Sequence, residues 1–236
     1  MYPIELKNVA KKATEYIEDG MIVSLGTGKT ASAMIHELGI LVEAGLSIKA
    51  VPTSNMSKEL AEYYHIPLVR TDEISKIDIA IDGGDEMDSN FNAIKGGGGA
   101  LFREKMNAFM SDHIIWIMIA AKRVEELGSF PLPIEIQPYA ITYVMQQLDR
   151  LSILYSLRKM NDGSAFFTEN QNLILDLSLQ CISDPVFTYS QLKSIPGVLE
   201  VGLFVNLCNT AIISTDSGVD ILKNNNASKP KIKEIL

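Results

Sequence analysis

Acidic side chains gather at one point of the chain, in the segment Asp82-Gly-Gly-Asp-Glu-Met-Asp88, directly after an apolar stretch. Carboxylates held in a pocket are suited to general acid/base catalysis. We expect Asp82 and Asp85 to point into such a pocket, while Glu86 and Asp88 face solvent. A solvated glycine-rich turn is the common alternative. A divalent metal site is a third, but no His or Cys lies nearby and the spacing of an EF-hand loop is absent. The residues of this segment by themselves leave the solvated turn and the acid/base site open.

A second candidate for chemistry is the segment Lys95-Gly-Gly-Gly-Gly-Ala-Leu-Phe-Arg-Glu-Lys105. Consecutive glycines before a helical stretch allow the backbone to approach a bound molecule closely. Lys95 precedes the glycines and Glu104 lies one to two turns into the helix, so both could face that molecule. A flexible linker is the alternative, but a linker has little purpose between two elements of one sheet domain. We therefore expect a binding site that includes Gly96, Gly97 and Gly98.

The segment Gly26-Thr-Gly-Lys-Thr30 resembles the end of a phosphate-binding P-loop, which would make the protein a nucleoside triphosphatase. The full motif needs a glycine five residues before Gly28, and that position is Val23, inside a predicted strand. A shorter loop suits one phosphate monoester, because the following helix begins with free N–H groups and a partial positive charge. An ordinary glycine turn explains the segment about equally well. The candidate phosphate contacts are Thr27, Gly28, Lys29 and Thr30.

The elements that must position these residues alternate between strand and helix. Hydrophobic periodicity predicts helices at 4–18, 31–44 and 58–64, and strands at 21–25, 48–51, 77–81 and 114–119. A repeated order of strand, turn and helix is typical of a parallel sheet covered by helices, an α/β fold. Ligands bind such sheets at the carboxyl ends of the strands. Segments 26–30, 52–55 and 82–88 should therefore converge on one edge.

The pattern changes after Gly128, where the chain becomes proline-rich. We expect helices at 139–148 and 189–195, paired strands at 164–168 and 173–179, and further strands at 201–205 and 210–214. This predicts a smaller α+β domain at 129–201, inserted before the last strand and helix of a larger domain formed by 1–128 and 202–236. The polar, basic tail from Lys223 to Leu236 is expected to be a loosely held extension.

Composition excludes several classes of protein. The 236 residues carry a formal net charge of −8, so no excess of basic charge is available to neutralise nucleic-acid phosphates. The beginning of the chain does not resemble a secretory signal, and the apolar run 114–121 is far shorter than the ~20 residues of a bilayer-spanning helix. Cys181 and Cys208 are interpreted as buried thiols of a reducing compartment, with one disulfide left open. The sequence predicts a cytoplasmic protein with no nucleic-acid or membrane partner.

Five groups of residues occur together and in order. They are Gly26-Thr-Gly-Lys-Thr30, Asp82-Gly-Gly-Asp-Glu86, Lys95-Gly-Gly-Gly-Gly-Ala-Leu-Phe-Arg-Glu-Lys105, Phe130-Pro-Leu-Pro-Ile-Glu135, and Pro196-Gly-Val198 with Gly202-Leu-Phe204. With these groups the chain resembles the type A ribose-5-phosphate isomerases over about residues 1–222. The acidic turn and the glycine-rich segment together are the most specific part of the resemblance.

The resemblance implies interconversion of D-ribose 5-phosphate and D-ribulose 5-phosphate in the pentose phosphate pathway, without cofactor or metal. Glu104 would be the base that moves a proton between C2 and C1. Other residues of the acidic and glycine-rich segments would line the sugar end of the site: Asp82, Gly83, Gly84, Asp85, Lys95, Gly96, Gly97 and Gly98. Thr27 to Thr30 and Lys122 would form the rest of the site. The implied fold is a Rossmann-like domain with a small α+β domain, assembled as a homodimer or homotetramer.

The chain departs from the family pattern at two positions. Lys29 stands where the family usually has Ser, which replaces a hydroxyl group by a cation in the candidate phosphate loop. Gly84 stands where the family usually has Ala, and both neighbouring carboxylates are kept. A non-catalytic sugar-phosphate sensor of the same fold class is the alternative function. A sensor would use the phosphate loop but has no need of Glu104, Lys95 and both aspartates.

Overall fold

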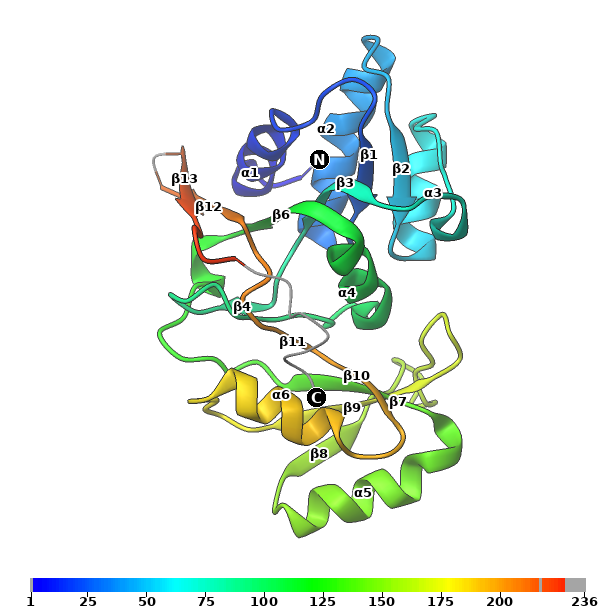
Figure 1. The fold of residues 1–236 in the computed structure, drawn as a ribbon, viewed down its shortest axis with the longest axis vertical. Helices are drawn as coiled ribbons and strands as arrows, with labels where there is room; N and C mark the ends of the chain where they lie inside the picture. Colours follow the sequence, from blue (N-terminus) through cyan, green and yellow to red (C-terminus); the bar gives the residue numbers. More distant parts are fainter. Residues whose placement is uncertain (1, 217, 228–236) are drawn as a thin grey trace. The chain divides into compact units, whose positions relative to one another are not determined.

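The computed structural model describes residues 2–216 and 218–227. Contacts between residues divide the chain, whose fold is drawn in Figure 1, into two compact units. The first unit consists of Met1–Gly83, Glu104–Ala121 and Asn206–Leu236, and the second consists of Gly84–Arg103 and Lys122–Val205. The predicted domain boundaries at 128 and 202 stay a prediction. In the contact-based division, residues 84–103 group with the second unit.

The first unit is built on a six-stranded sheet with the order β13-β12-β6-β3-β1-β2. Its strands are β1 (Ile22–Leu25), β2 (Lys49–Pro52), β3 (Ile77–Asp82), β6 (Ser111–Met118), β12 (Thr210–Thr215) and β13 (Gly218–Lys223). All neighbouring strands are parallel except β12 and β13, which are antiparallel. The unit also contains α1 (Ile4–Thr14), α2 (Lys29–Glu43) and α3 (Asn55–Tyr63).

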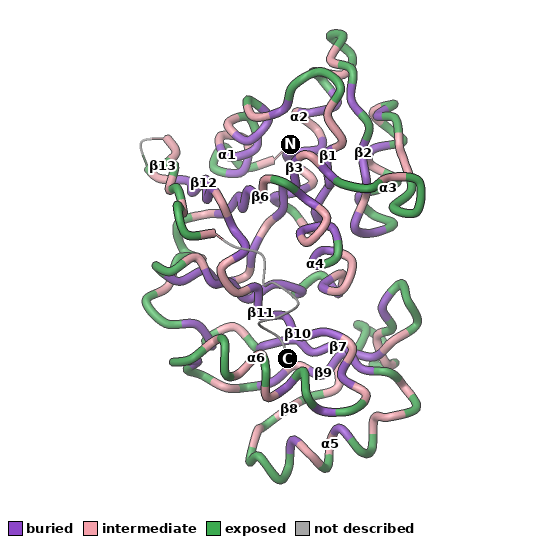
Figure 2. Tube along the Cα trace, viewed as in Figure 1, coloured by how far each residue is buried: buried purple, intermediate pink, exposed green. Residues whose placement is uncertain are grey.

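Helices lie on both faces of this sheet, as in a Rossmann-like fold. Side chains alternate along each strand, so Val23 and Leu25 of β1 belong to the hydrophobic core that includes residues of α1, α2 and α3. Ser24 points to the other face, where its hydroxyl oxygen accepts a hydrogen bond from Asn107 of α4 (Leu101–Met110) at 2.9 Å. Figure 2 shows that the central strands are largely buried between these layers. The predicted α/β class is confirmed.

The predicted order of elements in the first unit is confirmed up to β12, with boundaries that shift by a few residues. The largest shift is at α1, which ends at Thr14, followed by α3, which begins at Asn55, and β6, which begins at Ser111. The expected final helix is wrong, because the chain turns back after β12 and β13 adds to the sheet edge. The predicted loose tail lies largely outside the described residues, which end at 227.

The second unit contains two antiparallel sheets. A four-stranded sheet has the order β10-β7-β9-β8, with β7 (Leu132–Ile136), β8 (Leu154–Leu157), β9 (Leu173–Ser178) and β10 (Val198–Val201). A three-stranded ribbon has the order β11-β5-β4, with β4 (Glu86–Met87), β5 (Ala93–Ile94) and β11 (Leu203–Phe204). The helices are α5 (Ile141–Arg150) and α6 (Pro185–Lys193). The predicted α+β character of residues 129–201 is observed.

The predicted strand 164–168 is wrong. Residues 154–157 form β8 instead and pair with β9, whereas segment 164–168 makes isolated bridges through Ala165 and Phe167. The partners of β9 are therefore β7 and β8. Strand β7 lies in the proline-rich stretch, where hydrophobic periodicity predicts no strand. Proline lacks a backbone donor, but Pro133 is tolerated within this strand.

The two cysteines differ in their exposure to solvent. Cys208 is buried as predicted, but Cys181 is exposed, and its thiol donates to Glu126 Oε1 at 2.8 Å. The predicted burial of Cys181 is therefore wrong, and both cysteines are free thiols.

Across the described part of the chain, no helix has the length and apolar character needed to cross a bilayer.

Candidate functional site

The order of the parallel strands creates a switch point at one edge of the sheet in the first unit. The chain runs from β1 outward to β2 and then returns to the other side of β1 as β3. The loops that leave β1 and β3 consequently diverge, and ligands of open α/β sheets bind at such a switch point, outside the carboxyl ends of the strands. The loop after β1 is 26–28, and β3 ends at Asp82. Two of the predicted site segments therefore begin at this point.

A hydrogen bond joins these two segments. Asp82 Oδ1 accepts the backbone N–H groups of Thr27 at 3.0 Å and of Gly83 at 2.7 Å. Gly26 is required beside this carboxylate, since a Cβ atom there would lie 2.0 Å from Asp82 Oδ1. The expected convergence of segments 26–30 and 82–88 is confirmed for the part of the second segment that belongs to this unit.

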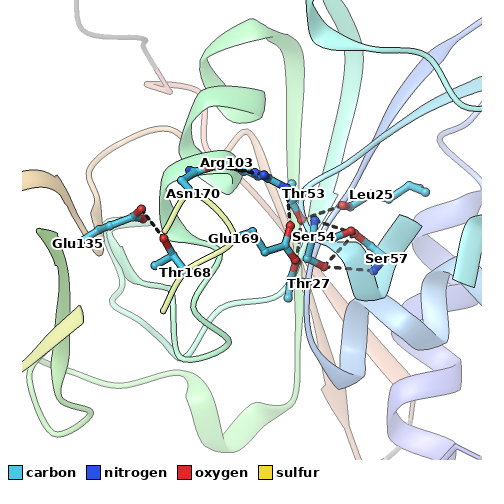
Figure 3. Close-up of polar contacts among 10 residues, drawn as sticks. All are labelled: Leu25, Thr27, Thr53, Ser54, Ser57, Arg103, Glu135, Thr168, Glu169 and Asn170. Carbon is cyan, nitrogen blue, oxygen red and sulfur yellow. Dashed lines mark hydrogen bonds and ion pairs between the residues drawn. The ribbon is translucent and has the colours of Figure 1, made fainter. Parts of the chain in front are cut away.

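The third predicted segment, 52–55, also reaches this edge. The Thr53 hydroxyl donates to the Leu25 carbonyl oxygen at 2.9 Å, and its oxygen lies 2.7 Å from the Thr27 hydroxyl (Figure 3). Because Thr53 has one hydroxyl hydrogen, Thr27 is the donor in the second contact. The lone pairs of Thr27 Oγ1 stay available to accept a further hydrogen bond.

The two helices that begin at this edge differ in their capping. Ser54 and Ser57 cap each other reciprocally at the first turn of α3 (Figure 3). The first turn of α2 follows Gly28, and among the described residues no side chain caps it. Uncapped N–H groups and the helix dipole favour an anion there. Lys29 is exposed and Thr30 is buried in this turn. The loop of three residues before α2 is too short for a P-loop, which supports the single-phosphate interpretation.

Glu104 lies on the buried face of α4, with 5% of its surface exposed. Asn107 and Ala108 follow at the helical spacing of three and four residues, which places them on the same face. The Asn107 side-chain amide donates to Ser24 Oγ at 2.9 Å, one residue before β1 ends. Asn107 thereby attaches the face of α4 that carries Glu104 to the strand that leads into loop 26–28.

In the second unit, the ribbon of β4 and β5 brings Asp85 next to Lys95. Glu86 pairs with Ile94 in the antiparallel register, so Asp85 and Lys95 are opposite each other one step further, and Asp85 N–H donates to the Ile94 carbonyl oxygen at 2.8 Å. Lys95 is only 3% exposed. Its Nζ atom lies 5.2 Å from the centroid of the Phe204 ring, within the range of a cation–π interaction.

The glycine segment forms a tight turn beside Asp85. Gly96 has a φ of +104°, which favours glycine, and its carbonyl oxygen accepts the Gly99 N–H at 2.9 Å. The Gly97 N–H donates to Asp85 Oδ2 at 2.8 Å, and a Cβ atom at Gly97 would lie 2.9 Å from both oxygens of that carboxylate. Gly97 and Gly98 are exposed at the tip of the turn. The turn therefore fixes a carboxylate and presents bare backbone to solvent.

Lys122 belongs to the second unit and is half-buried. Its Nζ atom donates to the carbonyl oxygen of Gly84 at 2.6 Å. Gly84 is itself buried between Gly83 and Asp85. This hydrogen bond places the Lys122 cation beside the acidic turn, and its assignment to the rest of the substrate site stays a prediction.

Glu86 and Asp88 do not face solvent, contrary to the expectation. Glu86 is 5% exposed and accepts the N–H groups of Gly128 at 2.7 Å and Phe130 at 2.6 Å. Asp88 is 7% exposed and accepts the N–H groups of Asn90 and Asn92. Both carboxylates replace missing backbone acceptors in loops, so burial is compatible with their charge. They are structural groups.

A buried carboxylate also organises the segment around Arg103. Glu135 Oε1 accepts a hydrogen bond from Thr168 Oγ1 at 2.9 Å (Figure 3) and another from Asn172 Nδ2 at 2.8 Å. The turn between these residues holds Arg103 through Glu169 and Asn170 (Figure 3). Burial raises the pKa of Glu135, although the two hydrogen bonds oppose that shift.

Several residues that support the candidate site are not predictable from sequence patterns. Thr53 lies in a segment that was expected at the edge, but Ser24, Asn107 and the turn 168–172 were not identified. Each acts through a contact with a residue far away in the sequence, as in the pair Asn107 and Ser24, which are 83 residues apart. Among the described residues, no group of three or more His, Cys, Asp or Glu side chains could hold a metal ion.

The sequence model of one family, ribose 5-phosphate isomerase A (phosphoriboisomerase A), matches residues 49–218. The chain belongs to this family. A ribose-5-phosphate isomerase A of Listeria innocua is 43% identical over 222 residues, which cover 93% of this chain and 99% of the relative. The Streptococcus pneumoniae protein of the same name is 42% identical over 212 residues, covering 89% of this chain and 93% of the relative.

Solved structures of isomerases share the fold. Ribose 5-phosphate isomerase A from Methanocaldococcus jannaschii has a TM-score of 0.89 at 35% identity and covers 94% of this chain and 99% of its own. A D-ribose-5-phosphate isomerase in complex with phospho-erythronic acid has a TM-score of 0.90 at 36% identity and covers 95% of this chain and 100% of its own. These similarities favour the isomerase family over the sensor alternative.

Proposed function

We propose that this protein is an aldose–ketose isomerase that interconverts D-ribose 5-phosphate and D-ribulose 5-phosphate in the non-oxidative branch of the pentose phosphate pathway. The observation that carries the proposal is similarity to ribose-5-phosphate isomerase A proteins along almost the whole chain. The complex of a relative with phospho-erythronic acid supports a phosphorylated sugar as the class of substrate. The uncapped first turn of α2 is suited to the phosphate group of such a substrate.

Isomerisation moves one hydrogen between neighbouring carbons. The carboxylate of Glu104 removes the proton from C2 of the open-chain aldose, the C–H electrons form the C1–C2 double bond, and O1 takes up a proton. The resulting enediol(ate) loses the proton of its O2 hydroxyl as the C2 carbonyl forms, and the protonated Glu104 returns its proton to C1. A base held in position contributes ~10²–10⁴ in rate to such a transfer. The low exposure of Glu104 protects the transferred proton from bulk water.

The remaining candidate residues have supporting roles in this proposal. Lys95 stabilises the negative charge that develops on the sugar oxygens, because a preorganised cation at that position costs no reorganisation during the reaction. Asp82 and Asp85 transfer protons in the opening of the sugar ring, assisted by the backbone of Gly83, Gly84 and Gly96 to Gly98. Thr27 to Thr30 and Lys122 bind the rest of the substrate, including its phosphate.

The proposal includes the setting of the enzyme. We propose a homodimer or homotetramer in the cytoplasm, acting without a metal or an organic cofactor. The test is to measure ribulose 5-phosphate formation from ribose 5-phosphate by the purified protein, with EDTA present and without nucleotide. Turnover is expected. Binding of ribose 5-phosphate without turnover would contradict the proposal and favour the sensor. Light scattering on the same sample gives the number of subunits.

A further inference from the structure

Arg158 directly follows β8 in the second unit and contacts the glycine turn that the proposed function uses. Its Nη1 group donates to the carbonyl oxygens of Gly96 at 2.9 Å and Gly97 at 3.1 Å. An arginine side chain that binds two successive carbonyl oxygens restricts the orientation of both peptide groups. The side chain of Arg158 is 14% exposed and Gly96 is buried, so the hydrogen bond to Gly96 is largely shielded from water, whereas Gly97 is exposed.

One peptide group is held at both of its ends. The carbonyl oxygen of Gly96 and the N–H of Gly97 belong to the same planar peptide. The oxygen accepts from Arg158 at 2.9 Å, and the N–H donates to Asp85 Oδ2 at 2.8 Å. Rotation of this peptide would break both hydrogen bonds at once. Because glycine has few backbone restrictions of its own, the orientation of the Gly96–Gly97 peptide depends on these two partners and on the Gly99 N–H, which also donates to the Gly96 carbonyl oxygen.

The guanidinium group is itself held in place. Asp176 of β9 accepts from Arg158 Nε at 2.9 Å and also from Nη2, a paired contact that fixes the guanidinium plane. Phe166 completes the support: its N–H donates to the Arg158 carbonyl oxygen at 2.9 Å, and its ring centroid is 5.9 Å from Arg158 Cζ. A Cβ atom at Gly99 would lie 2.4 Å from the Phe166 ring, so the same ring supports the far end of the turn.

We propose that Arg158 is a positioning residue for the isomerisation: with Asp176 it orients the Gly96–Gly97 peptide, and through the Gly97 N–H it holds the carboxylate of Asp85 in its reactive position. This inference rests on the proposed function, because it assigns Asp85 to the reaction. In this proposal Arg158 acts on the glycine turn and not on the substrate. Its effect on turnover passes through Asp85.

A purely structural ion pair is the competing explanation, and the two differ in how mutations combine. If Arg158 acts through Asp85, its substitution should matter only while the Asp85 carboxylate is present. If Arg158 merely stabilises the fold, the substitution should cost the same in either background. A double-mutant cycle separates these cases, because residues that act as one unit are not additive.

The experiment compares Arg158→Lys with wild type, with Asp85→Asn and with the double variant. Lysine keeps the charge but loses the planar fork that binds Asp176 and the carbonyl oxygens together. We expect Arg158→Lys to lower kcat/KM by ~10- to 100-fold, since small displacements of catalytic groups have effects of this size. In the Asp85→Asn background the same change should lower kcat/KM by less than about twofold. The matched control is Arg150→Lys, an exposed arginine of α5, which should retain wild-type activity.

A second variant tests whether a folding defect explains the loss of activity. Arg158→Met combined with Asp176→Asn removes both charges with little change in side-chain volume, so neither charge is left without its partner. We expect a melting temperature close to that of wild type and the same loss of kcat/KM as in Arg158→Lys. Wild-type activity in this folded variant would overturn the inference, as would an equal loss in the two Asp85 backgrounds. If wild type itself did not turn over ribose 5-phosphate, the proposed function would fail instead.

Discussion

At the scale of single residues, the proposed chemistry depends most on Glu104. Its side chain is buried on the face of α4 that Asn107 attaches to β1. Glu104→Gln keeps the size and polarity of the side chain and removes the base. We expect the variant to fold and bind ribose 5-phosphate normally, while kcat falls by ~10²–10⁴.

The measurement for this prediction is initial rate together with binding affinity for ribose 5-phosphate. The exposed Glu43 at the end of α2 offers a matched control, since Glu43→Gln removes the same charge from the surface. Turnover of Glu104→Gln close to that of wild type would remove Glu104 from the role of base.

Lys29 is a second residue-scale prediction, because it stands where the family usually has Ser. It is the first residue of α2, and its side chain is exposed. A cation there would attract the substrate phosphate without contributing to proton transfer. We expect Lys29→Ser to raise KM for ribose 5-phosphate by ~2- to 5-fold with kcat unchanged, as for other exposed charge interactions.

This effect should depend on ionic strength, since salt screens exposed charges. The KM values of wild type and Lys29→Ser should approach each other as salt is added. An identical KM for the two proteins at low salt would show that Lys29 makes no contribution to substrate binding.

Among the secondary-structure elements, β4 depends on Glu86, which has a structural role although its place in the acidic segment predicted an exposed side chain. Its carboxylate accepts the N–H groups of Gly128 and Phe130, which connects the β4 ribbon to the loop before β7. In Glu86→Gln only one side-chain oxygen stays to accept one of these two N–H groups, and the side-chain NH₂ group is placed against the second N–H group. We expect the free energy of unfolding to fall by about 1–3 kcal/mol.

Denaturant unfolding followed by circular dichroism measures this change. Glu125→Gln is the control, because Glu125 is exposed in the same part of the chain and should have little effect. A midpoint of Glu86→Gln equal to that of wild type would contradict the structural assignment. Activity is a useful second measurement, since Asp85 precedes Glu86 and a loosened β4 should also lower turnover.

At the scale of the whole molecule, the buried Glu135 should make stability depend on pH. Burial raises the pKa of Glu135 above its ordinary value of 4.5. The folded state then holds the proton more tightly than the unfolded state does, so the stabilisation is complete below pH 4.5 and is lost as pH rises through the raised pKa. Glu135→Gln cannot ionise, and its carbonyl oxygen can still accept from Thr168 and Asn172.

We therefore expect the free energy of unfolding of the wild type to fall relative to that of Glu135→Gln as pH rises from 4.5 through the raised pKa of Glu135. Urea unfolding at a series of pH values measures this difference. Parallel pH curves for the two proteins would contradict the predicted titration. Glu125→Gln, in which an exposed carboxylate is removed, should show no such pH-dependent difference.

The sequence by itself determined the order of most elements and the residues that could do chemistry. Local hydrophobic periodicity indicates the alternating strands and helices, so the α/β class and the sheet of the first unit were predictable. The segments 26–30, 82–88 and 95–105 were identifiable because their glycines, carboxylates and lysines are unusual within a few neighbouring residues.

Tertiary structure alone decided which polar groups are catalytic candidates and which support the fold. Glu86 and Asp85 are adjacent in sequence, yet the first binds loop N–H groups and the second faces the glycine turn. Sequence patterns also do not predict that β9 pairs with β8. The same holds for the contact of Arg158 with Gly96, which lies 62 residues away in the chain. The physical reason is that periodicity reports local conformation, whereas strand partners and buried hydrogen bonds depend on segments brought together by folding.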